Sequence, residues 1–413
     1  MNPIQISIGG QSNVVGLSIE IGPFVGWGVM ALNLALELAR QPGRNLAPLV
    51  PFRLEVFANP MHRHQLALAL STYKALQKTL DKYPGQALQL QGAVLHGLDG
   101  FAAPGAVPGY GIQLFSNMAH IRGRPTLAIT FQENTLLAPA AFEHTRAFDR
   151  ILTGATWNAR MLQGHGLTQA MPWFQGIDPT LFHPAPRAGL FRGRFVIFSG
   201  GKLEYRKGQD QVLAAFKVFH ARHPDAFLLT AWQNYIPAFM AGLENTGHVQ
   251  GLPEHEAHSL NLRPWLVRNG IAAQDCFDIG RVPNHVMPQI LREADVAVFC
   301  SRAEGGTNLV AMECMACGLP TILSGNTGHL DLGGEDHCYL LRTQGPVKPT
   351  EKYPGVDGWG ETSVEEIVEA LEAVYADRAE ATRRGQAAAV FMQDWTWEKQ
   401  VQRLLAEIDA FNP

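Results

Sequence analysis

Two carboxylates and a pair of glycines lie close together in the last third of the chain. Glu304 directly precedes Gly305 and Gly306, and Glu313 follows on a short segment that is expected to be helical. The glycines remove side chains that would keep a phosphate away from the backbone. A carboxylate one turn into a helix can accept hydrogen bonds from ribose hydroxyls, and a carboxylate in the preceding loop can meet a sugar. This pattern predicts a site for a phosphorylated sugar ligand, in particular a nucleotide sugar.

The elements that must position these groups are two strands and the helix between them. The apolar runs 296–300 and 321–324 are typical of parallel strands covered on both faces. Between them, Thr307 or Asn308 can cap a helix that ends before Gly318 and Pro320. The first N–H groups and the dipole of such a helix favour an anion. The donor-binding residues expected here are Gly305, Gly306, Thr307, Asn308, Leu309 and Glu313.

The same segment resembles the acidic motif of family-4 retaining glycosyltransferases of the GT-B fold. In this chain Glu304 and Glu313 are followed by the run from Cys314 to Pro320, similar to the Ala-Met-Ala-Cys-Gly-x-Pro run of that family. The two glutamates are one residue further apart than is usual, and Cys314 replaces an alanine. The form Glu-Gly-Gly-Thr-Asn-Leu is similar to one bacterial branch of the family. The resemblance implies an α/β fold of two Rossmann-like, doubly wound parallel-sheet domains that face a cleft.

The length of 413 residues exceeds one ordinary hydrophobic core, so two domains are expected. We place an N-terminal, acceptor-side domain at 1–182 and a C-terminal, nucleotide-sugar-binding domain at 190–390. The Pro- and Gly-rich stretch 175–189 joins them. The remaining residues, 391–413, contain an amphipathic run opened by Thr396, and the resemblance implies that this helix crosses back to the N-terminal domain.

Strand-like and helical runs alternate throughout, which favours parallel sheets built from βαβ units. The expected strands are 16–21, 53–57, 93–96, 127–131 and 150–154 in the first half, and 195–199, 227–232, 276–279, 296–300, 321–324 and 339–341 in the second. Helices are expected at 29–40, 66–83 and 156–164.

A cationic segment follows the first strand of the second half. A leaving pyrophosphate gathers negative charge, so cations must lie beside it. Lys202 and Lys207 follow Gly201, and they occupy the positions of the family's paired Arg and Lys. The resemblance implies that both lysines are catalytic and that Gly201 contacts the donor. Solvated surface cations are the alternative, and Arg206 receives no role.

Two further segments are assigned to the donor by resemblance. Gly26, Trp27 and Gly28 belong to a Gly-rich stretch before a helical run. It is similar to the family's loop that approaches donor phosphates and acceptor, although a turn with a packed Trp27 would explain it too. Arg281 and Val282 lie in a segment similar to the family's Leu-Gly-Arg-Val run, whose backbone holds the nucleobase.

The acceptor side is expected at the ends of two N-terminal strands. His96 and Asn134 are acceptor-side candidates, and Glu133 is a candidate for activating the acceptor hydroxyl or for a structural role. The loop 324–331 could line the sugar or acceptor side, or be a plain loop. His62 and His64 are expected on a surface loop, because no third metal ligand has suitable spacing.

Composition excludes some other classes. The net charge of −4 gives no sequence-wide reason to bind nucleic acid or an acidic membrane. No Asp-x-Asp occurs in the sequence, which argues against the metal-dependent GT-A type, so we expect neither a metal nor a cofactor.

Cys314 and Cys317 form a lone Cys-x-x-Cys, and both are expected to be core residues of a protein in a reducing cytoplasm. No signal peptide or spanning segment is expected, and peripheral contact with a membrane-borne acceptor stays open.

The sequence thus predicts a retaining, metal-independent glycosyltransferase that moves a sugar from a nucleoside-diphosphate donor to an acceptor hydroxyl. A UDP-sugar is favoured, a GDP-sugar stays open, and the acceptor (glycan, lipid-linked glycan, protein or small molecule) is not defined. Three alternatives remain: another GT-B activity such as a sugar-nucleotide epimerase or a phosphorylase, a transferase acting on modified DNA bases, and a non-catalytic nucleotide-sugar-binding protein.

Overall fold

The computed structural model describes residues 3–7, 13–84, 86–101, 112–114, 120–234, 236–256 and 259–411, with only the backbone at 101 and 112–114. The chain divides into two compact units. Unit 1 contains 1–132, 136–176 and 396–413, and unit 2 contains 133–135 and 177–395. The Pro- and Gly-rich stretch therefore enters unit 2 at Ile177, and the short segment Glu133–Thr135 belongs to unit 2 as well.

Unit 1 is built on a parallel sheet with the strand order β10-β9-β8-β5-β2-β3. Its strands are β2 (Val14–Ser18), β3 (Asn45–Pro48), β5 (Gly92–Phe101), β8 (Thr126–Thr130), β9 (Arg150–Thr153) and β10 (Ala170–Pro172), with β6 (Ile112–Leu114) antiparallel on β5. A smaller sheet joins β1 (Ile4–Ile6), β4 (Leu88–Leu90) and β7 (Ile121–Arg122). The helices are α1 (Gly26–Arg40), α2 (Pro60–Leu80), α3 (Pro139–Thr145), α4 (Thr156–Gly164) and α11 (Trp397–Asp409).

Unit 2 has a parallel sheet with the order β15-β12-β11-β16-β17-β18. Counted along the chain this is the order 3-2-1-4-5-6 of a Rossmann sheet, whose ligands bind where the order reverses, at the carboxyl ends of the first and fourth strands. Those two strands are β11 and β16. The bounds are β11 (Phe195–Gly200), β12 (Ala226–Ala231), β15 (Cys276–Asp278), β16 (Val296–Phe299), β17 (Thr321–Ser324) and β18 (Tyr339–Leu341).

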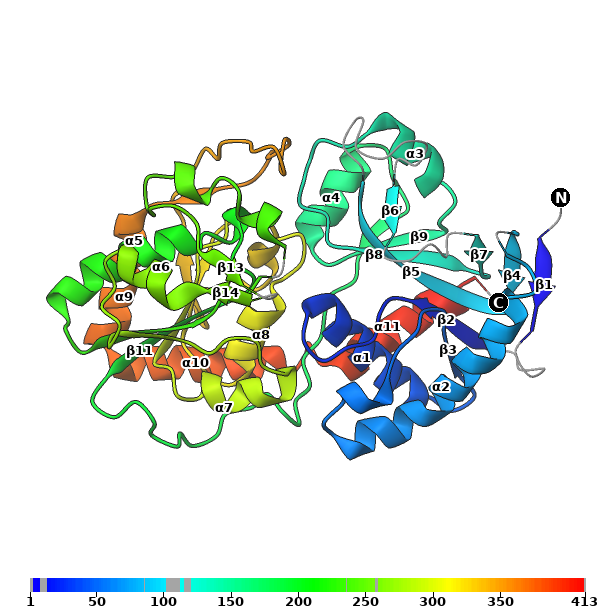
Figure 1. Cartoon of the computed structure of the whole chain (residues 1–413), viewed down its shortest axis with the longest axis horizontal. Coiled ribbons are helices and arrows are strands. Elements are labelled where there is room, and N and C mark those ends of the chain that lie inside the picture. Colours follow the sequence, from blue (N-terminus) through cyan, green and yellow to red (C-terminus); the bar gives the residue numbers. More distant parts are fainter. Residues whose placement is uncertain are drawn as a thin grey trace. The chain divides into compact units, whose positions relative to one another are not determined.

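The other elements of unit 2 are helices around this sheet (Figure 1) and two short antiparallel strand pairs. The helices are α5 (Gln209–Arg222), α6 (Leu262–Arg268), α7 (Met287–Leu291), α8 (Leu309–Ala316), α9 (Val364–Ala376) and α10 (Arg378–Met392). The antiparallel pairs are β13 (Glu254–Glu256) with β14 (Ser259–Asn261), and β19 (Gln344–Gly345) with β20 (Glu361–Thr362).

The last helix returns to unit 1. Thr396 caps α11, since its hydroxyl accepts a hydrogen bond from the amide of Lys399. The helix buries Trp397, Val401 and Leu404, and it packs beside α1 (Figure 1). The indole N–H of Trp173 donates to the carbonyl of Gln400, which fixes the helix to the chain just before the crossing into unit 2.

Most expected strands are present within a few residues of their predicted bounds, but the strand expected at 53–57 is wrong. Leu54–Val56 form a 3-10 helix, η1, and the strand beside β2 is β3, Asn45–Pro48. This strand has only four residues and ends in proline, which a sheet tolerates at its edge. Its short pattern gave no strand signal in the sequence.

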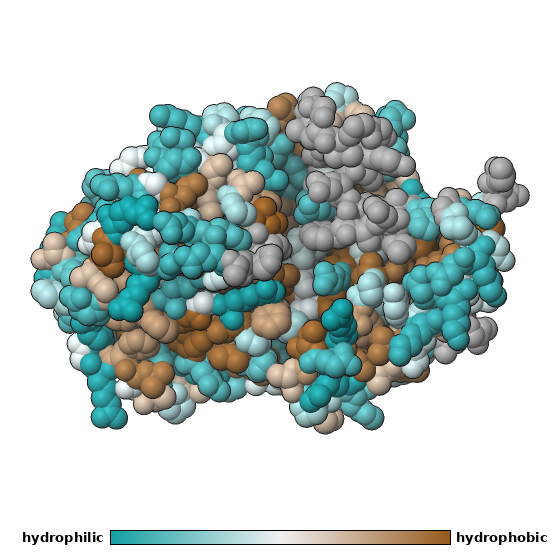
Figure 2. Space-filling view, in the orientation of Figure 1, coloured by the Kyte–Doolittle hydropathy of each residue, from teal (hydrophilic) through white to brown (hydrophobic). Residues whose placement is uncertain are grey.

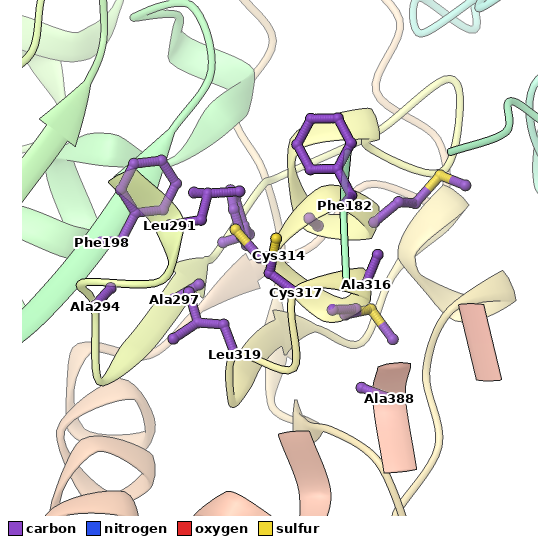
Figure 3. Packing of buried hydrophobic residues seen from close by; sticks show 14 of the residues in the cluster. Phe182, Phe198, Leu291, Ala294, Ala297, Cys314, Ala316, Cys317, Leu319 and Ala388 are labelled. Atoms are coloured by element: carbon purple, nitrogen blue, oxygen red, sulfur yellow. The ribbon is translucent and has the colours of Figure 1, made fainter. Parts of the chain in front are cut away.

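The core of unit 2 explains the cysteines. Cys314 of α8 and Cys317, which directly follows that helix, lie among apolar side chains that include Leu291, Leu319 and Phe182 (Figure 3). All five cysteines are free and buried. The prediction that Cys314 and Cys317 are core residues is therefore confirmed.

Arg302 is a fully buried cation beside this core. Its guanidinium makes paired hydrogen bonds to both oxygens of Asp210, at 2.9 and 2.7 Å, and to both oxygens of Glu361. It also donates to the carbonyl of Tyr205. A buried charge is tolerated only with such pairing, so Arg302 joins the loop after β16 to α5 and β20.

On the face shown in Figure 2, hydrophilic residues are interspersed with smaller groups of hydrophobic ones. Among the described residues, no helix is both long and apolar enough to cross a membrane.

We predict that Arg302→Leu lowers the free energy of unfolding by about 3–5 kcal/mol, because the substitution leaves Asp210 buried without its partner. The matched control is Arg383→Leu, which removes an exposed ion pair to Glu380 on α10 and should cost about 0–1 kcal/mol. Urea denaturation followed by tryptophan fluorescence measures both. Equal shifts of the two unfolding midpoints would show that the buried pairing is not stabilising.

Candidate functional site

The helix start that the sequence predicts is present at the carboxyl end of β16. Asn308 is the N-cap of α8, with a left-handed backbone (φ 66°), and its side-chain oxygen accepts from the amide of Ala311 at 3.4 Å. The amides of Leu309 and Val310 begin the helix and have no carbonyl one turn back within it. They form, with the helix dipole, a place that favours an anion.

Glu304 lies in the loop before this helix and is held by several donors. The ammonium of Lys207 lies 2.7 and 2.8 Å from its two oxygens, and the guanidinium of Arg206 donates to Oε2 at 2.9 Å. The Ser301 hydroxyl donates to Oε1 at 2.6 Å. The side chain of Glu304 is only 4% exposed, so these bonds are made away from solvent and fix the carboxylate.

The ionisation of this pair follows from burial and charge. Burial alone would raise the pKa of Glu304, but Lys207 and Arg206 outweigh burial and hold that pKa at about 2. Burial lowers the pKa of Lys207, and Glu304 opposes that shift. Glu304 is therefore an anion at neutral pH.

Glu304 and Lys207 belong to a larger charge cluster. We use this name for six side chains, three cationic and three anionic, that meet at the carboxyl ends of β11 and β16: Lys202, Arg206, Lys207, Glu133, Glu204 and Glu304. Glu204 lies 2.8 Å from the ammonium of Lys202 and 2.9 Å from the guanidinium of Arg206. Glu133 lies 3.3 Å from the same guanidinium. Arg206, to which the sequence analysis assigned no role, thus contacts all three carboxylates of the charge cluster.

The loop after β17 holds the backbone of Glu304 by two hydrogen bonds. The Thr327 hydroxyl accepts from the amide of Glu304 at 2.8 Å, and the amide of Gly328 donates to the carbonyl of Glu304 at 3.1 Å. A Cβ at Gly328 would lie 1.8 Å from the carbonyl oxygen of Gly306. Only glycine allows this close approach. The loop 324–331 is therefore a support of the site.

His329 connects the same loop to the helix cap. The Ser324 hydroxyl donates its proton to the Ser301 carbonyl, so it accepts from Nδ1–H of His329 at 2.9 Å. The other ring nitrogen then accepts from the amide group of Asn308 at 3.1 Å. Burial lowers the pKa of His329 to about 4, which keeps the ring neutral. His329 holds Asn308, and no motif in the sequence pointed to this contact.

Glu313 lies one turn into α8 and is 3% exposed. Its Oε1 accepts from the side-chain amide of Asn284 at 2.6 Å. Burial raises the pKa of Glu313 to about 8, against the opposing effect of Asn284. Asn284 directly follows the segment that contains Arg281 and Val282, so this bond brings the predicted nucleobase segment beside the predicted ribose carboxylate.

Gly201 and Lys202 directly follow β11 and lead towards the charge cluster. Gly201 has φ 108°, and a Cβ there would lie 3.9 Å from the ammonium of Lys207. A Cβ on Gly200 would lie 2.8 Å from Val310 on α8. The strand end of β11 therefore lies against the start of α8, as the Rossmann strand order requires.

The segment Glu133–Thr135 is held by the loop before β20. The carbonyl of Glu133 accepts from the indole of Trp359 at 3.0 Å, and the side chain of Asn134 accepts from the amide of Gly355 at 2.8 Å. Asn134 thus caps a loop. Burial raises the pKa of Glu133, and Arg206 opposes the shift.

The unit 1 candidates differ from expectation in their local structure. Gly26, Trp27 and Gly28 form the first turn of α1 rather than a loop before it. The ring of Trp27 packs edge-on against Phe131, with centroids 4.7 Å apart. His96 was expected at a strand end, which is wrong because β5 continues to Phe101.

His96 is also buried within the sheet. The residue is 1% exposed, and its Nε2 lies 2.9 Å from the carbonyl of Ile121. Burial lowers its pKa to about 4. A structural role in the sheet accounts for these contacts, and they give the acceptor-side role no support.

His62 and His64 were expected on a loop, and this is wrong because both belong to helix α2. A different set of residues could reach a metal. Among the described residues, Asp210, His248 and Glu361 bring potential ligand atoms within 4.8 Å of one another. The cation that binds both carboxylates there is Arg302.

Gly328→Ala should displace the loop that carries Glu304, because the new methyl group would overlap the carbonyl of Gly306. We expect a cost of about 2 kcal/mol or more in the free energy of unfolding, the range found for overpacked positions. The control Gly345→Ala meets its nearest atom at 3.5 Å and should be nearly neutral. Thermal unfolding compares the two, and an unchanged melting temperature for Gly328→Ala would contradict the described contact.

Sequence comparisons match part of the chain. A model of the family described as "Family 4 Glycosyltransferase in conflict systems" matches residues 284–404. D-inositol 3-phosphate glycosyltransferase of Arthrobacter sp. is 26% identical over 236 residues, 54% of this chain and 46% of that protein. Mannosylfructose-phosphate synthase of Agrobacterium fabrum is 31% identical over 157 residues, 36% of this chain and 31% of that protein. The chain spans less than half the length of either curated relative.

Solved structures match nearly the whole chain at low identity. Sucrose-phosphate synthase of Thermosynechococcus elongatus has a TM-score of 0.61 at 15% identity and covers 97% of this chain and 99% of its own. HepE of Anabaena, in complex with UDP and glucose, has a TM-score of 0.60 at 11% identity and covers 97% and 100%. These neighbours confirm the predicted GT-B fold of two parallel-sheet α/β domains. The family-model match and the two curated relatives support a family-4-like glycosyltransferase.

Proposed function

We propose that the protein is a glycosyltransferase that moves a sugar from a nucleoside-diphosphate sugar to an acceptor hydroxyl, with retention of configuration and without a metal ion. The observation that carries this proposal is the meeting of Lys207 and Glu304 at the N-terminus of α8. Anion-binding amides, a buried ammonium and a sugar-facing carboxylate suit a sugar diphosphate. HepE, a structural neighbour, has been solved with UDP-glucose, which favours a UDP-sugar as the donor.

Each group then has one chemical task. The amides of Leu309 and Val310, with Lys202 and Lys207, hold the diphosphate and stabilise the charge that gathers on it as the glycosidic bond breaks. Glu313 accepts from the ribose hydroxyls, and the backbone at Arg281 and Val282 contacts the base. Glu304 binds the sugar. The resemblance implies that a pyrophosphate oxygen helps to take the acceptor proton, with Glu133 as a further candidate.

The direct test is a product assay with several sugar nucleotides and a panel of acceptors. A new glycoside with the anomeric configuration of the donor, formed in the presence of EDTA, is the expected result. An isomerised sugar nucleotide would indicate an epimerase, and release of a sugar phosphate would indicate a phosphorylase. Tight binding of UDP-sugars without turnover on any acceptor would favour the non-catalytic alternative.

Glu304→Gln should lower kcat by about 100-fold, because it removes a charged contact to the donor sugar. The dissociation constant for UDP, which carries no sugar, should change little. The control Glu335→Gln changes an exposed carboxylate and should leave both quantities unchanged. Steady-state kinetics and calorimetric titration with UDP make the comparison, and an unchanged kcat would contradict the sugar-binding role of Glu304.

Donor affinity should depend on pH through Glu313. Ribose hydroxyls stabilise its carboxylate, so binding favours loss of the proton that the raised pKa of about 8 retains in the free protein. Affinity for UDP-glucose should therefore fall as pH drops below about 8, by at most roughly tenfold per pH unit.

Calorimetric titrations in buffers across this range measure the effect, and Glu313→Gln should remove it. Lys207 would act in the opposite direction. Because its pKa is lowered, Lys207 loses its positive charge more readily as the pH rises, and this weakens diphosphate binding at alkaline pH. Affinity for UDP-glucose that is independent of pH in the unsubstituted protein would contradict the role of Glu313.

A further inference from the structure

The guanidinium of Arg206 contacts both Glu304, the proposed sugar-binding carboxylate, and Glu133, the candidate for activating the acceptor. The Nη1 of Arg206 donates to Oε2 of Glu304 at 2.9 Å and to the carbonyl of Ala303 at 3.2 Å. The Nη2 lies 3.3 Å from Oε1 of Glu133, and Nε lies 2.9 Å from Oε2 of Glu204. Three carboxylates from three separate segments of the chain thus share a single planar cation.

We propose that Arg206 is a positioning residue that fixes Glu133, as the carboxylate that activates the acceptor hydroxyl, at a set place relative to Glu304 on the donor sugar. This inference rests on the proposed transferase function. It assigns to Glu133 the acceptor-activating role, and it gives Arg206 a role in setting the position and charge of Glu133.

The side chains of the cluster differ in how far they are exposed to solvent. The side chains of Glu204, Glu304 and Arg206 are 1%, 4% and 9% exposed, whereas that of Glu133 is 23% exposed. Glu133 is thus the most accessible of the three carboxylates. Its backbone is fixed by the bond from Trp359, and its carboxylate by Arg206. A carboxylate held at both ends and open on one side suits proton abstraction from a bound hydroxyl.

Only an arginine can make this set of contacts. Its planar fork presents several N–H groups in fixed directions, whereas a lysine offers one compact ammonium. Lys207 also binds Glu304, through both oxygens. A diphosphate would compete for that ammonium, and Glu304 would then keep Arg206 as its partner. Arg206 therefore prevents the sugar-binding carboxylate from becoming a buried, unpaired charge.

The ionisation of Glu133 depends on the same neighbours. Burial raises its pKa, Arg206 is the largest opposing effect, Glu204 and Glu304 raise the pKa further, and Lys202 lowers it. Tyr353, from the loop before β20, hydrogen-bonds Arg206 and interacts electrostatically with Glu133, and burial raises its own pKa. Loss of the Arg206 charge should therefore raise the pKa of Glu133, so that a higher pH is needed to form the base.

The experiment compares Arg206→Met, Arg206→Lys and the control Arg263→Lys, an exposed arginine on α6. Arg206→Met should lower kcat by about 100-fold, the effect of misplacing a reacting group, with a smaller change in KM for the donor. The acid limb of its pH–kcat profile should move to higher pH. Arg206→Lys keeps the charge and should restore the position of the acid limb but only part of kcat. Arg263→Lys should match the unsubstituted enzyme.

A second readout does not require turnover. In protein labelled with ¹³C at glutamate carboxyls, the resonance lost in Glu133→Gln identifies Glu133, and its titration should move to higher pH in Arg206→Met. If this shift occurs but no transferase activity is found, the proposed function fails and the coupling stands. An acid limb and a Glu133 titration that are both unchanged in Arg206→Met would overturn the inference. So would a normal kcat in Glu133→Gln.

Discussion

Buried charges need partners of opposite sign, and this requirement organises the candidate site. Glu304 lies in a loop of low exposure, where an isolated carboxylate would take up a proton. Lys207 and Arg206 keep it ionised, and Arg206 in turn is balanced by Glu133 and Glu204. With Lys202 the cluster contains three cations and three anions. Removing one member takes an ionic partner from at least one other, so the geometry of the site and its charge are determined together.

The fold brings these groups together from distant parts of the chain. Lys207 and Glu304 are 97 residues apart, yet the order β15-β12-β11-β16-β17-β18 makes the strands that precede them neighbours. Each residue follows the carboxyl end of its own strand, so the contact follows from the sheet topology. The loop after β17 then supports Glu304, because Thr327, Gly328 and His329 all contact the segment from Glu304 to Asn308.

The sequence predicted the parts of this arrangement that are encoded locally. Buried strands such as β11 and β16 are runs of apolar residues, and the Asn308 cap and the break at Gly318 have their own signals. Contacts between distant segments have no such signal. In the sequence, Asn284 is only a polar residue after a proline, and His329 is only a histidine in a loop. The fold brings Asn284 to Glu313 and His329 to Asn308. Strand β3 was missed because Asn45–Pro48 is too short to show a period.

The extra residue between Glu304 and Glu313 can be located by the same reasoning. Glu313 is the fifth residue of α8, so the helix alone fixes its direction relative to Leu309. Any additional residue must therefore lie in the loop 305–308, where Asn308 adopts a left-handed backbone and Gly306 touches Gly328. A longer loop could rotate Glu304, but its carboxylate is bound by Lys207 and Arg206, which come from another element. The direction of Glu304 is thus set by its ionic partners rather than by its distance along the chain from Glu313.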